Sequence, residues 1–411
     1  MRFILLVMSL VSMPFSMVFA KTIELHKGIA TDIWVSWPDE ERLKAEPDLV
    51  NTFPEWRQSI GPAQIANLRK AGFDFVRLTI DPQAYIWEVS PEKTAKLNAN
   101  VLQAVQLFRD QDLNVLVDFH AIPTGGYRKY GTESYLASPE AFTNFVAQSA
   151  SLAQSLSTLD PAHVAFEPMN EPVLDCAYDA GGNTHKWRGM ALQLHHAARK
   201  AAPTLTLVMQ GSCWGGAEGL ADLDPAAFKD KNIIWDFHSY DPFMFTHQGA
   251  EWAEGPERYI SGLHFPPQPK QQKSIIAATL ARIKKADLSD AKKQQLSEEA
   301  NFDLNQYFEP GAALKQHAKS FTIVEEWAKT HHVAADHILL GEFGANRTED
   351  TAKPLAADRL AFVELSRRAA EKRGYAWSFW DWSGSMSPTN NDQDRVVLPS
   401  YIKALGLQTR K

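Results

Sequence analysis

Short apolar runs alternate with longer stretches of helical spacing along almost the whole chain. The runs have the length of buried strands, and in the stretches between them apolar residues recur every three or four positions. In residues 60–72, for example, Ile65 and Leu68 share one face and Gly72 is a typical helix end. We predict strands at residues 28–34, 73–80, 113–119, 164–171 with its turn, 205–210, 233–238, 338–343 and 375–380. We predict helices at residues 60–72, 95–111, 139–157, 184–202, near Pro225, at least twice within 273–332, at 354–373 and from about 398.

This alternation predicts an α/β fold. Near-continuous apolar strands separated by amphipathic helices are typical of a parallel sheet covered by helices. Eight such units over about 390 residues favour a closed (β/α)8 TIM barrel. The alternative is a doubly wound open sheet, which normally has a glycine-rich phosphate turn after its first strand. Residues 34–37, Trp-Val-Ser-Trp, are unlike such a turn. We therefore predict one barrel domain, residues 21–411, with an elaborated helical region before strand seven.

The first twenty residues differ from the rest of the chain. Arg2 precedes an apolar stretch that ends in Val18-Phe19-Ala20, a pattern typical of a secretory signal peptide cleaved after Ala20. An uncleaved membrane anchor is the alternative, because the run is nearly long enough to span a bilayer. Pro14 and three serines weaken that alternative. We expect a secreted or periplasmic protein with no stable membrane association after cleavage.

Composition narrows the classes of partner. The net charge of -7 and the absence of a basic cluster with interleaved aromatics argue against a nucleic-acid partner. The chain has 12 Trp, many of them in predicted loops, where exposed indole rings suit stacking against sugars. Oligomeric state cannot be predicted from these features. Aromatic residues that follow strand ends and could stack on sugars, or simply pack in loops, are Trp34, Trp37, Trp87, Tyr127, Trp214 and Trp382.

Polar and aromatic side chains mark the ends of the predicted strands. In a barrel the active site lies at the carboxyl ends of the strands. Each such residue alone has a structural explanation: His120 and His238 suit hydrogen-bonded core histidines, and Arg77 suits an ion pair at the rim. Their convergence on one rim favours a functional site. The residues are Arg77, His120, Asn170, Glu171, His238, Tyr240, Glu342 and Trp380.

Two carboxylates in this set suggest the chemistry. Glu171 precedes Pro172, which disfavours a helical conformation and places it at a turn. Glu342 follows strand seven, so the two would face each other across the barrel mouth. Cleavage of a glycosidic bond needs such a pair, one as proton donor and one as nucleophile or base. A neighbouring Arg77 would lower the pKa of Glu342, whereas apolar surroundings would raise the pKa of Glu171.

Four motifs carry a family resemblance. Phe166-Glu167-Pro168-Met169-Asn170-Glu171-Pro172, His238-Ser239-Tyr240, Gly341-Glu342-Phe343-Gly344 and Ser378-Phe379-Trp380 occur in that order. Together they resemble glycoside hydrolase family 5, the cellulase family, over residues 28–382. The resemblance implies a retaining hydrolase of a polysaccharide, foremost an endo-acting β-1,4-glucanase.

The resemblance also implies a role for each residue of the set. Glu171 would be the acid/base and Glu342 the nucleophile, held by Arg77 and Tyr240. Asn170 would bond the sugar 2-hydroxyl, His120 and His238 would line the cleavage subsite, and Trp380 would be its stacking floor. Departures at residues 31–34 and in the aromatic-rich loop 241–262, which we expect to shape distal subsites, leave the substrate open. β-Mannanase, xyloglucanase, licheninase and exo-acting β-glucosidase are alternatives within the family.

Cysteine and metal chemistry are limited. Cys176 and Cys213 follow consecutive strands and are either paired in an oxidising compartment or two buried thiols. No His/carboxylate grouping has metal-ligand spacing, so we expect neither a metal nor a cofactor. A metal-dependent hydrolase is a further alternative, but it is disfavoured because the first predicted strand lacks a His-x-His pair. A non-catalytic carbohydrate-binding barrel is a hypothesis of a different class, disfavoured because Arg77, Glu171 and Glu342 are all present.

Overall fold

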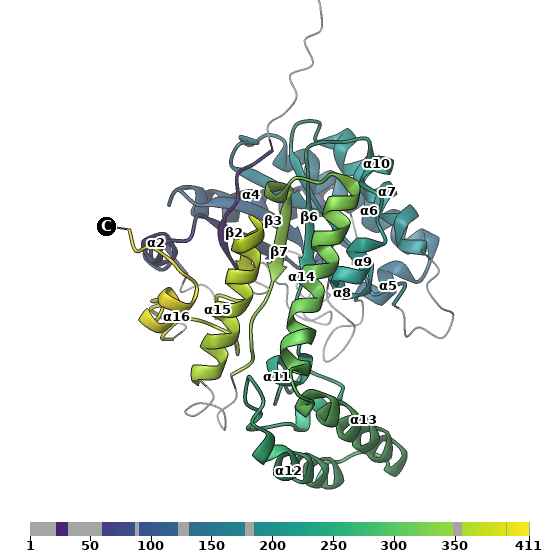
Figure 1. Ribbon diagram of the computed structural model, residues 1–411. Helices are drawn as coiled ribbons and strands as arrows, with labels where there is room; N and C mark the ends of the chain where they lie inside the picture. The colour runs from purple at the N-terminus through teal and green to yellow at the C-terminus, as the bar shows by residue number, and fades with distance from the viewer. Residues whose placement is uncertain are drawn as a thin grey trace, which may run out of the picture.

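The protein is a closed barrel of eight parallel strands with helices on its outside (Figure 1). The computed structural model describes residues 22–31, 60–86, 90–121, 131–176, 185–347, 356–391 and 393–410. Each strand pairs with its neighbours in sequence order, and β1 closes the barrel against β8. This arrangement confirms the predicted (β/α)8 barrel. The strands are β1 (Lys27–Ala30), β2 (Phe75–Ile80), β3 (Asn114–Phe119), β4 (Val164–Glu167), β5 (Thr206–Gln210), β6 (Ile233–His238), β7 (Ile338–Glu342) and β8 (Ala376–Phe379).

Helices follow the strands as the apolar spacing predicts. The long ones are α2 (Pro62–Ala71), α4 (Pro91–Arg109), α6 (Pro139–Leu156), α7 (Lys186–Ala201), α12 (Gln272–Lys285), α13 (Asp290–Phe308), α14 (Ala312–His331) and α15 (Ala356–Arg373). Short pieces lie in the loops: α3 (Gln83–Ile86), α5 (Thr132–Leu136), α8 (Ser212–Gly215), α9 (Ala217–Ala221), α10 (Pro225–Phe228), α11 (Phe243–Thr246), η2 (Pro256–Tyr259), η3 (Pro269–Gln271), η4 (Ala335–His337) and α16 (Pro399–Ala404).

Local capping explains where two of the barrel helices begin. Ser90 precedes α4 and its hydroxyl accepts a hydrogen bond from the backbone N–H of Lys93. Ser138 does the same for Ala141 at the start of α6. In both helices a proline occupies the first turn, where its missing N–H costs nothing.

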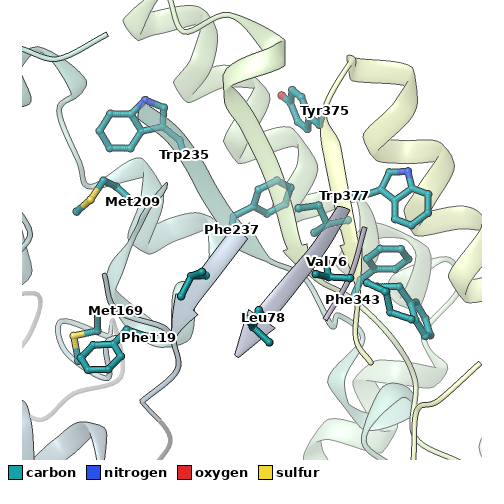
Figure 2. Packing of buried hydrophobic residues seen from close by; sticks show 14 of the residues in the cluster. Val76, Leu78, Phe119, Met169, Met209, Trp235, Phe237, Phe343, Tyr375 and Trp377 are labelled. Atoms are coloured by element: carbon teal, nitrogen blue, oxygen red, sulfur yellow. The ribbon is translucent and has the colours of Figure 1, made fainter. Parts of the chain in front are cut away.

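The main hydrophobic core lies between the strands and the helices around them. Outward-facing side chains such as Val76 and Leu78 on β2 and Trp377 on β8 belong to one continuous cluster (Figure 2). Because a strand alternates its faces, the same strands send every second residue into the barrel. The helices therefore cover an almost wholly apolar outer face, as the near-continuous apolar runs predict.

Inside the barrel, the inward-facing side chains form two layers, and each strand from β2 to β8 contributes one residue to each layer. The lower layer is apolar, and residues Ile23 and Leu25 before β1 join it. Two residues further along each strand the inward position is polar or glycine. We call this second layer, which lies beneath the barrel mouth, the charged floor. The apolar layer is Phe75, Leu116, Ala165, Val208, Ile234, Leu339 and Ala376, and the layer above it is Arg77, Asp118, Glu167, Gln210, Asp236, Gly341 and Ser378.

The predicted elaboration before strand seven is a projecting helical pair. Figure 1 shows α12 and α13 beyond the barrel beside α11, while α14 returns along its side. The pair has its own small cluster around Ile283, Leu296 and Ala300. Among the described helices, none has both the length and the apolarity required to cross a bilayer.

Candidate active site

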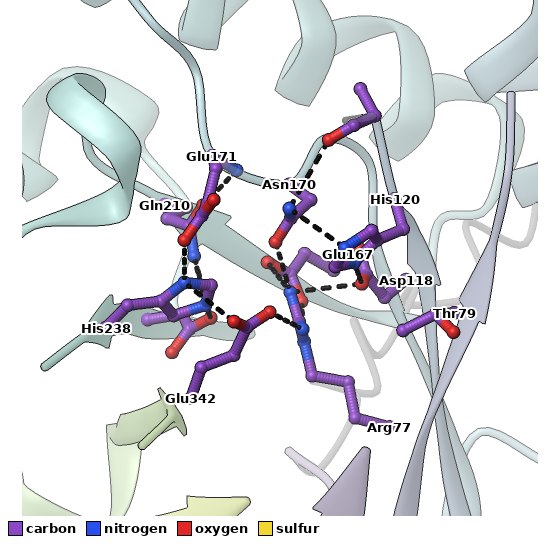
Figure 3. A network of polar contacts seen from close by, with 12 residues as sticks. Arg77, Thr79, Asp118, His120, Glu167, Asn170, Glu171, Gln210, His238 and Glu342 are labelled. Atoms are coloured by element: carbon purple, nitrogen blue, oxygen red, sulfur yellow. Dashed lines mark hydrogen bonds and ion pairs between the residues drawn. The ribbon is translucent and has the colours of Figure 1, made fainter. Parts of the chain in front are cut away.

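Arg77 is the centre of the charged floor. It lies in the middle of β2, not at the strand end as the sequence pattern suggested, and its long side chain reaches the mouth from inside the barrel. The guanidinium donates to Glu167 from Nε at 2.8 Å and to Glu342 from Nη1 at 2.6 Å (Figure 3). Its Nη2 donates to Oδ1 of Asn170 at 2.7 Å and lies 3.1 Å from Asp118. One buried cation thus ties together residues from β2, β3, β4 and β7.

Glu342 is held as a carboxylate. One oxygen accepts from Arg77, and the other accepts from the Tyr240 hydroxyl at 2.8 Å. Burial alone would raise the pKa of Glu342, but the neighbouring His238 ring, the Arg77 guanidinium and the Tyr240 hydroxyl outweigh it and lower the pKa below its usual range. Nδ1 of His238 lies 3.6 Å from the same carboxylate. Glu342 is therefore ionised and fixed at both oxygens.

Glu171 has the opposite character. It follows β4 in the turn, with a φ of 41° that is uncommon for a residue other than glycine. Its Oε1 lies 2.7 Å from Nδ1 of His238, and its side chain is 22% exposed. Burial, with the negative charge of Glu342, raises the pKa of Glu171 even though His238 opposes the shift. A raised pKa suits a group that must carry a proton.

The two glutamates are close enough to act on one bond. One oxygen of Glu171, one of Glu342 and one nitrogen of His238 all lie within 4.8 Å of one another. Glu167, Asp236 and His238 form a second such group. Either group has atoms of the kinds that bind metal, but the Glu167 carboxylate already accepts from Arg77 through both oxygens. Glu342 likewise accepts from Arg77 and Tyr240, so the oxygens of Glu167 and Glu342 are already engaged in hydrogen bonds.

The remaining predicted residues border the same floor. Asn170 places its Nδ2 3.4 Å from Nε2 of His120 and 3.4 Å from the carbonyl oxygen of Ala121. His120 is oriented by Asp118, whose Oδ2 lies 2.5 Å from its Nδ1. The His120 ring stacks on Trp380 with centroids 5.2 Å apart. All eight residues predicted from the strand ends therefore meet in one connected network.

Four residues of the network were missed by sequence reasoning. Asp118, Glu167, Gln210 and Asp236 are buried and lie inside strands, not beyond them. The available signal was the position two residues after the inward apolar residue of each strand. Gly341 belongs to the same layer, and a Cβ there would lie 2.2 Å from Asp236 Oδ2. Glycine at this position is thus required by the space that Asp236 fills.

The loops after β4 and β5 are joined beside Glu171. The structure pairs Cys176 with Cys213 in a disulfide. The backbone N–H of Cys213 donates to Leu174 at 3.0 Å, and that of Trp214 donates to Pro172 at 3.2 Å. The turn that carries Glu171 is therefore tied to the end of β5 by one covalent bond and two backbone hydrogen bonds.

The aromatic residues that could stack on sugars differ in how far the structure buries them. Trp382 is fully buried beneath Arg395, so of the two alternatives left by the sequence, sugar stacking and packing, its ring packs in the core. Trp214 is 40% exposed. Trp34, Trp37, Trp87 and Tyr127 lie outside the described residues, as do positions 32–34 of the predicted first strand.

Aromatic rings also lead outward from Tyr240. Its ring meets His247 edge-on at 5.0 Å, and Phe243 stacks on His247 at 3.7 Å. Trp252 meets His247 at 5.1 Å. Burial lowers the pKa of His247 to about 3, so its ring is neutral near pH 7. Phe243 and Trp252 remain 41% and 62% exposed, so the loop presents two aromatic side chains to solvent.

Comparison with known proteins agrees with this geometry. Residues 44–386 match the model of the family described as cellulase, glycosyl hydrolase family 5. The chain belongs to glycosyl hydrolase family 5. The match includes Arg77, Glu171 and Glu342, so family 5 membership and the charged floor concern the same part of the chain.

Relatives of this family 5 chain include endoglucanases. It is 23% identical over 365 residues to endoglucanase 3 of Fibrobacter succinogenes, covering 85% of this chain and 50% of that protein. It is 27% identical over 208 residues to endoglucanase C of Acetivibrio thermocellus, covering 50% of this chain and 57% of that protein. The chain thus matches about half the length of these curated relatives.

Solved structures share the fold. A structure described as an endoglucanase aligns with a TM-score of 0.63 at 21% identity, covering 93% of this chain and 97% of that one. Thermotoga maritima Cel5A in complex with cellobiose aligns with a TM-score of 0.61 at 21% identity, again over 93% and 97% of the two chains. At these identities the likeness establishes the barrel alone.

Proposed function

We propose that this family 5 hydrolase cleaves β-1,4-glucan chains internally with retention of anomeric configuration. Glu342 is the nucleophile and Glu171 the acid/base. The observation that carries the proposal is the pair itself: two carboxyl groups with oxygens within 4.8 Å and pKa values shifted in opposite directions. Retaining glycosidases have carboxyl groups only about 5–5.5 Å apart, whereas inverting enzymes leave room for a water.

The geometry supports a two-step mechanism. In the first step the ionised Glu342 attacks the anomeric carbon, while Glu171 gives its proton to the departing sugar oxygen. In the second step Glu171 takes a proton from water, the water attacks the same carbon, and the bond to Glu342 breaks. Arg77 and Tyr240 hold the attacking carboxylate in both steps through bonds of 2.6 and 2.8 Å. Glu171 gives its proton to the departing sugar oxygen in the first step and regains one from water in the second, so both glutamates return to their starting protonation states.

Substrate contacts follow from the surrounding rings. Trp380 is half-buried beside His120, where it suits stacking beneath the sugar at the cleaved bond. Asn170 lies between Arg77 and His120, where its amide can bond a sugar hydroxyl. Phe243 and Trp252 lie further out and suit rings of a longer chain. Such an extended set of contacts favours a polysaccharide over a disaccharide.

The endoglucanase relatives support glucan as the substrate. A second candidate is β-mannan, because a similar structure, Thermotoga maritima Cel5A, is described in complex with mannotriose (TM-score 0.61, 21% identity). Both sugars share the β-1,4 linkage and differ in the orientation of one hydroxyl. The residue placed to sense that hydroxyl is Asn170.

We also propose that the protein acts outside the cytoplasm, as the sequence of residues 1–20 suggests. The Cys176–Cys213 disulfide is typical of an oxidising compartment. N-terminal sequencing of the protein purified from its native host tests this. A mature chain that begins at Lys21 supports export, and one that begins at Met1 contradicts cleavage.

The function is tested by assaying reducing ends and viscosity on β-glucans and β-mannans. We expect viscosity to fall early on a β-1,4-glucan, with the β-anomer as first product by NMR. Glu171→Gln and Glu342→Gln should abolish this, whereas Glu298→Gln on the exposed face of α13 should not. Wild-type turnover by either active-site variant would overturn the assignment. Binding of glucan without turnover would indicate a carbohydrate-binding barrel, and loss of activity with a chelator would indicate a metal hydrolase.

A further inference from the structure

Gln210 occupies an unusual place beside the proton donor. It is the last residue of β5, is 1% exposed, and belongs to the inward polar layer. Its Oε1 accepts a hydrogen bond from the backbone N–H of Glu171. Its Nε2 lies 2.8 Å from Nε2 of His238 and donates to Asp236 at 3.1 Å (Figure 3). One side chain thus touches both the main chain of Glu171 and the histidine that touches the Glu171 carboxyl group.

The orientation of this amide is determined by its partners. A backbone N–H can only donate, so the atom of Gln210 that faces Glu171 must be the oxygen. The NH2 group then faces His238 and Asp236. Asp236 takes one of its hydrogens, and the other points to Nε2 of His238, which can accept only if that nitrogen carries no proton.

This arrangement decides where the histidine carries its hydrogen. With Nε2 as an acceptor, the ring proton of His238 lies on Nδ1, which is 2.7 Å from Oε1 of Glu171. His238 therefore donates to Oε1, and the transferable proton of Glu171 lies on Oε2. The contacts form a closed circuit from the Glu171 main chain through Gln210 and His238 back to the Glu171 carboxyl group.

Three nearby carboxylates favour a second proton on the His238 ring. Glu171 and Glu342 face Nδ1, and Asp236 lies 3.4 Å from Nε2. Burial opposes a charge on the ring, but these acids raise the pKa of His238. The amide NH2 of Gln210 opposes a second proton directly, because it fills the position that a hydrogen on Nε2 would require.

We propose that Gln210 is a positioning residue for the acid/base, holding the Glu171 main chain and keeping His238 in the Nδ1–H form that leaves the acidic proton on Oε2. The inference rests on the proposed function, since it assigns Glu171 the role of proton donor. The surroundings fix Gln210 itself. A Cβ on Gly215, which has a φ of 65°, would lie 2.6 Å from the side-chain amide carbon of Gln210, and the Trp187 indole N–H donates to the backbone carbonyl oxygen of Gln210 at 2.9 Å.

Loss of Gln210 should slow the hydrolysis of some substrates and not of others. Loss of the amide would let His238 gain a second proton, and an imidazolium beside Glu171 would stabilise the carboxylate and lower its pKa. The acid would then lose its proton at lower pH and be misplaced. Only substrates that need protonation of the leaving group would suffer, because a strongly acidic phenol departs without help.

The test compares two variants on two substrates. Gln210→Met has similar length but neither hydrogen-bonding atom, and Gln210→Glu keeps the acceptor for Glu171 without the donor. The matched control is Gln148→Met, which removes a buried glutamine bonded to Thr94 outside the barrel. The substrates are phenyl β-cellobioside and 2,4-dinitrophenyl β-cellobioside, and kcat/KM is measured against pH.

We expect both Gln210 variants to lose roughly 10- to 100-fold in kcat/KM on the phenyl glycoside, within the range of general acid catalysis. Loss on the dinitrophenyl glycoside should be under about threefold, and the basic limb on the phenyl substrate should move to lower pH. Equal loss on both substrates, or no loss, would overturn the proposal. If wild type hydrolyses neither glycoside, the proposed function fails first and is recognised as such.

A measurement on the unmodified protein covers the case in which the variants do not fold. The carbon and nitrogen NMR shifts of a histidine-labelled sample distinguish the two neutral tautomers and the charged ring. The His238 signal, assigned by comparison with His238→Gln, should show the Nδ1–H form at the pH of maximal activity. The Nε2–H form or a fully charged ring at that pH would contradict the role of Gln210.

Discussion

Arg77 donates to Glu342 at 2.6 Å, although the two residues are 265 positions apart in the sequence. The same guanidinium bonds Glu167 through two of its nitrogens. A planar fork with several donors can satisfy such a set, whereas a lysine ammonium cannot match its geometry. Arg77 therefore both orients Glu342 and neutralises part of the acidic floor around it.

Replacing Arg77 with Met should raise the pKa of Glu342 and weaken the fold. The acidic limb of kcat/KM should then move to higher pH, because a carboxylate without its cation gains a proton sooner. Breaking a buried ion pair costs about 3–5 kcal/mol, which urea unfolding would measure. Arg77→Lys should recover part of the pH shift but little of the geometry. An unchanged acidic limb in a folded Arg77→Met variant would contradict this role of the arginine.

The wild-type pH profile should be bell-shaped with limbs set by the two glutamates. Glu342 must be ionised, so activity falls as pH drops through its lowered pKa. Glu171 must be protonated, so activity falls as pH rises through its raised pKa. This basic limb should be present for wild type with phenyl β-cellobioside, and absent for Glu171→Gln assayed with 2,4-dinitrophenyl β-cellobioside, which needs no acid. Persistence of that limb would assign it to another group.

The exposed pair Phe243 and Trp252 should contribute to binding of long substrates. An aromatic contact is worth roughly 0.5–1.5 kcal/mol, so Trp252→Ala or Phe243→Ala should lower kcat/KM on cellohexaose by about 2- to 12-fold. Short aryl glycosides should be unaffected. Phe302→Ala is the control, because Phe302 is as exposed as Trp252 but lies on the projecting α13. Equal losses on long and short substrates would argue against a distal subsite.

The Cys176–Cys213 disulfide should stabilise the fold. Its closed loop spans 37 positions, and such links typically contribute about 2–4 kcal/mol. The Cys176→Ser/Cys213→Ser double variant should show that loss in urea unfolding, and a reductant should then have no further effect. Unchanged stability would mean that the two backbone hydrogen bonds between these loops suffice to hold them.

The barrel and most of the site could be predicted because their signals are local. Near-continuous apolar runs, and helices with apolar residues every three or four positions, can be recognised within a short window of residues, and eight such units favour a closed barrel. The strand ends then bring Glu171 and Glu342 to the same rim. The sequence alone thus determined the fold, the family and the two carboxylates on which we base the proposed chemistry.

Tertiary structure decided what lies beneath that rim. Asp118, Glu167, Gln210 and Asp236 sit within apolar strands, and only the barrel's interior places them in contact with Arg77 or His238. Trp382 follows a strand end like Trp380 but turns into the core, which no local pattern reveals. Opposite pKa shifts for two glutamates likewise depend on which charges lie within a few ångströms. Such distances arise from closure of the barrel, because electrostatic interactions follow separation in space and not position along the chain.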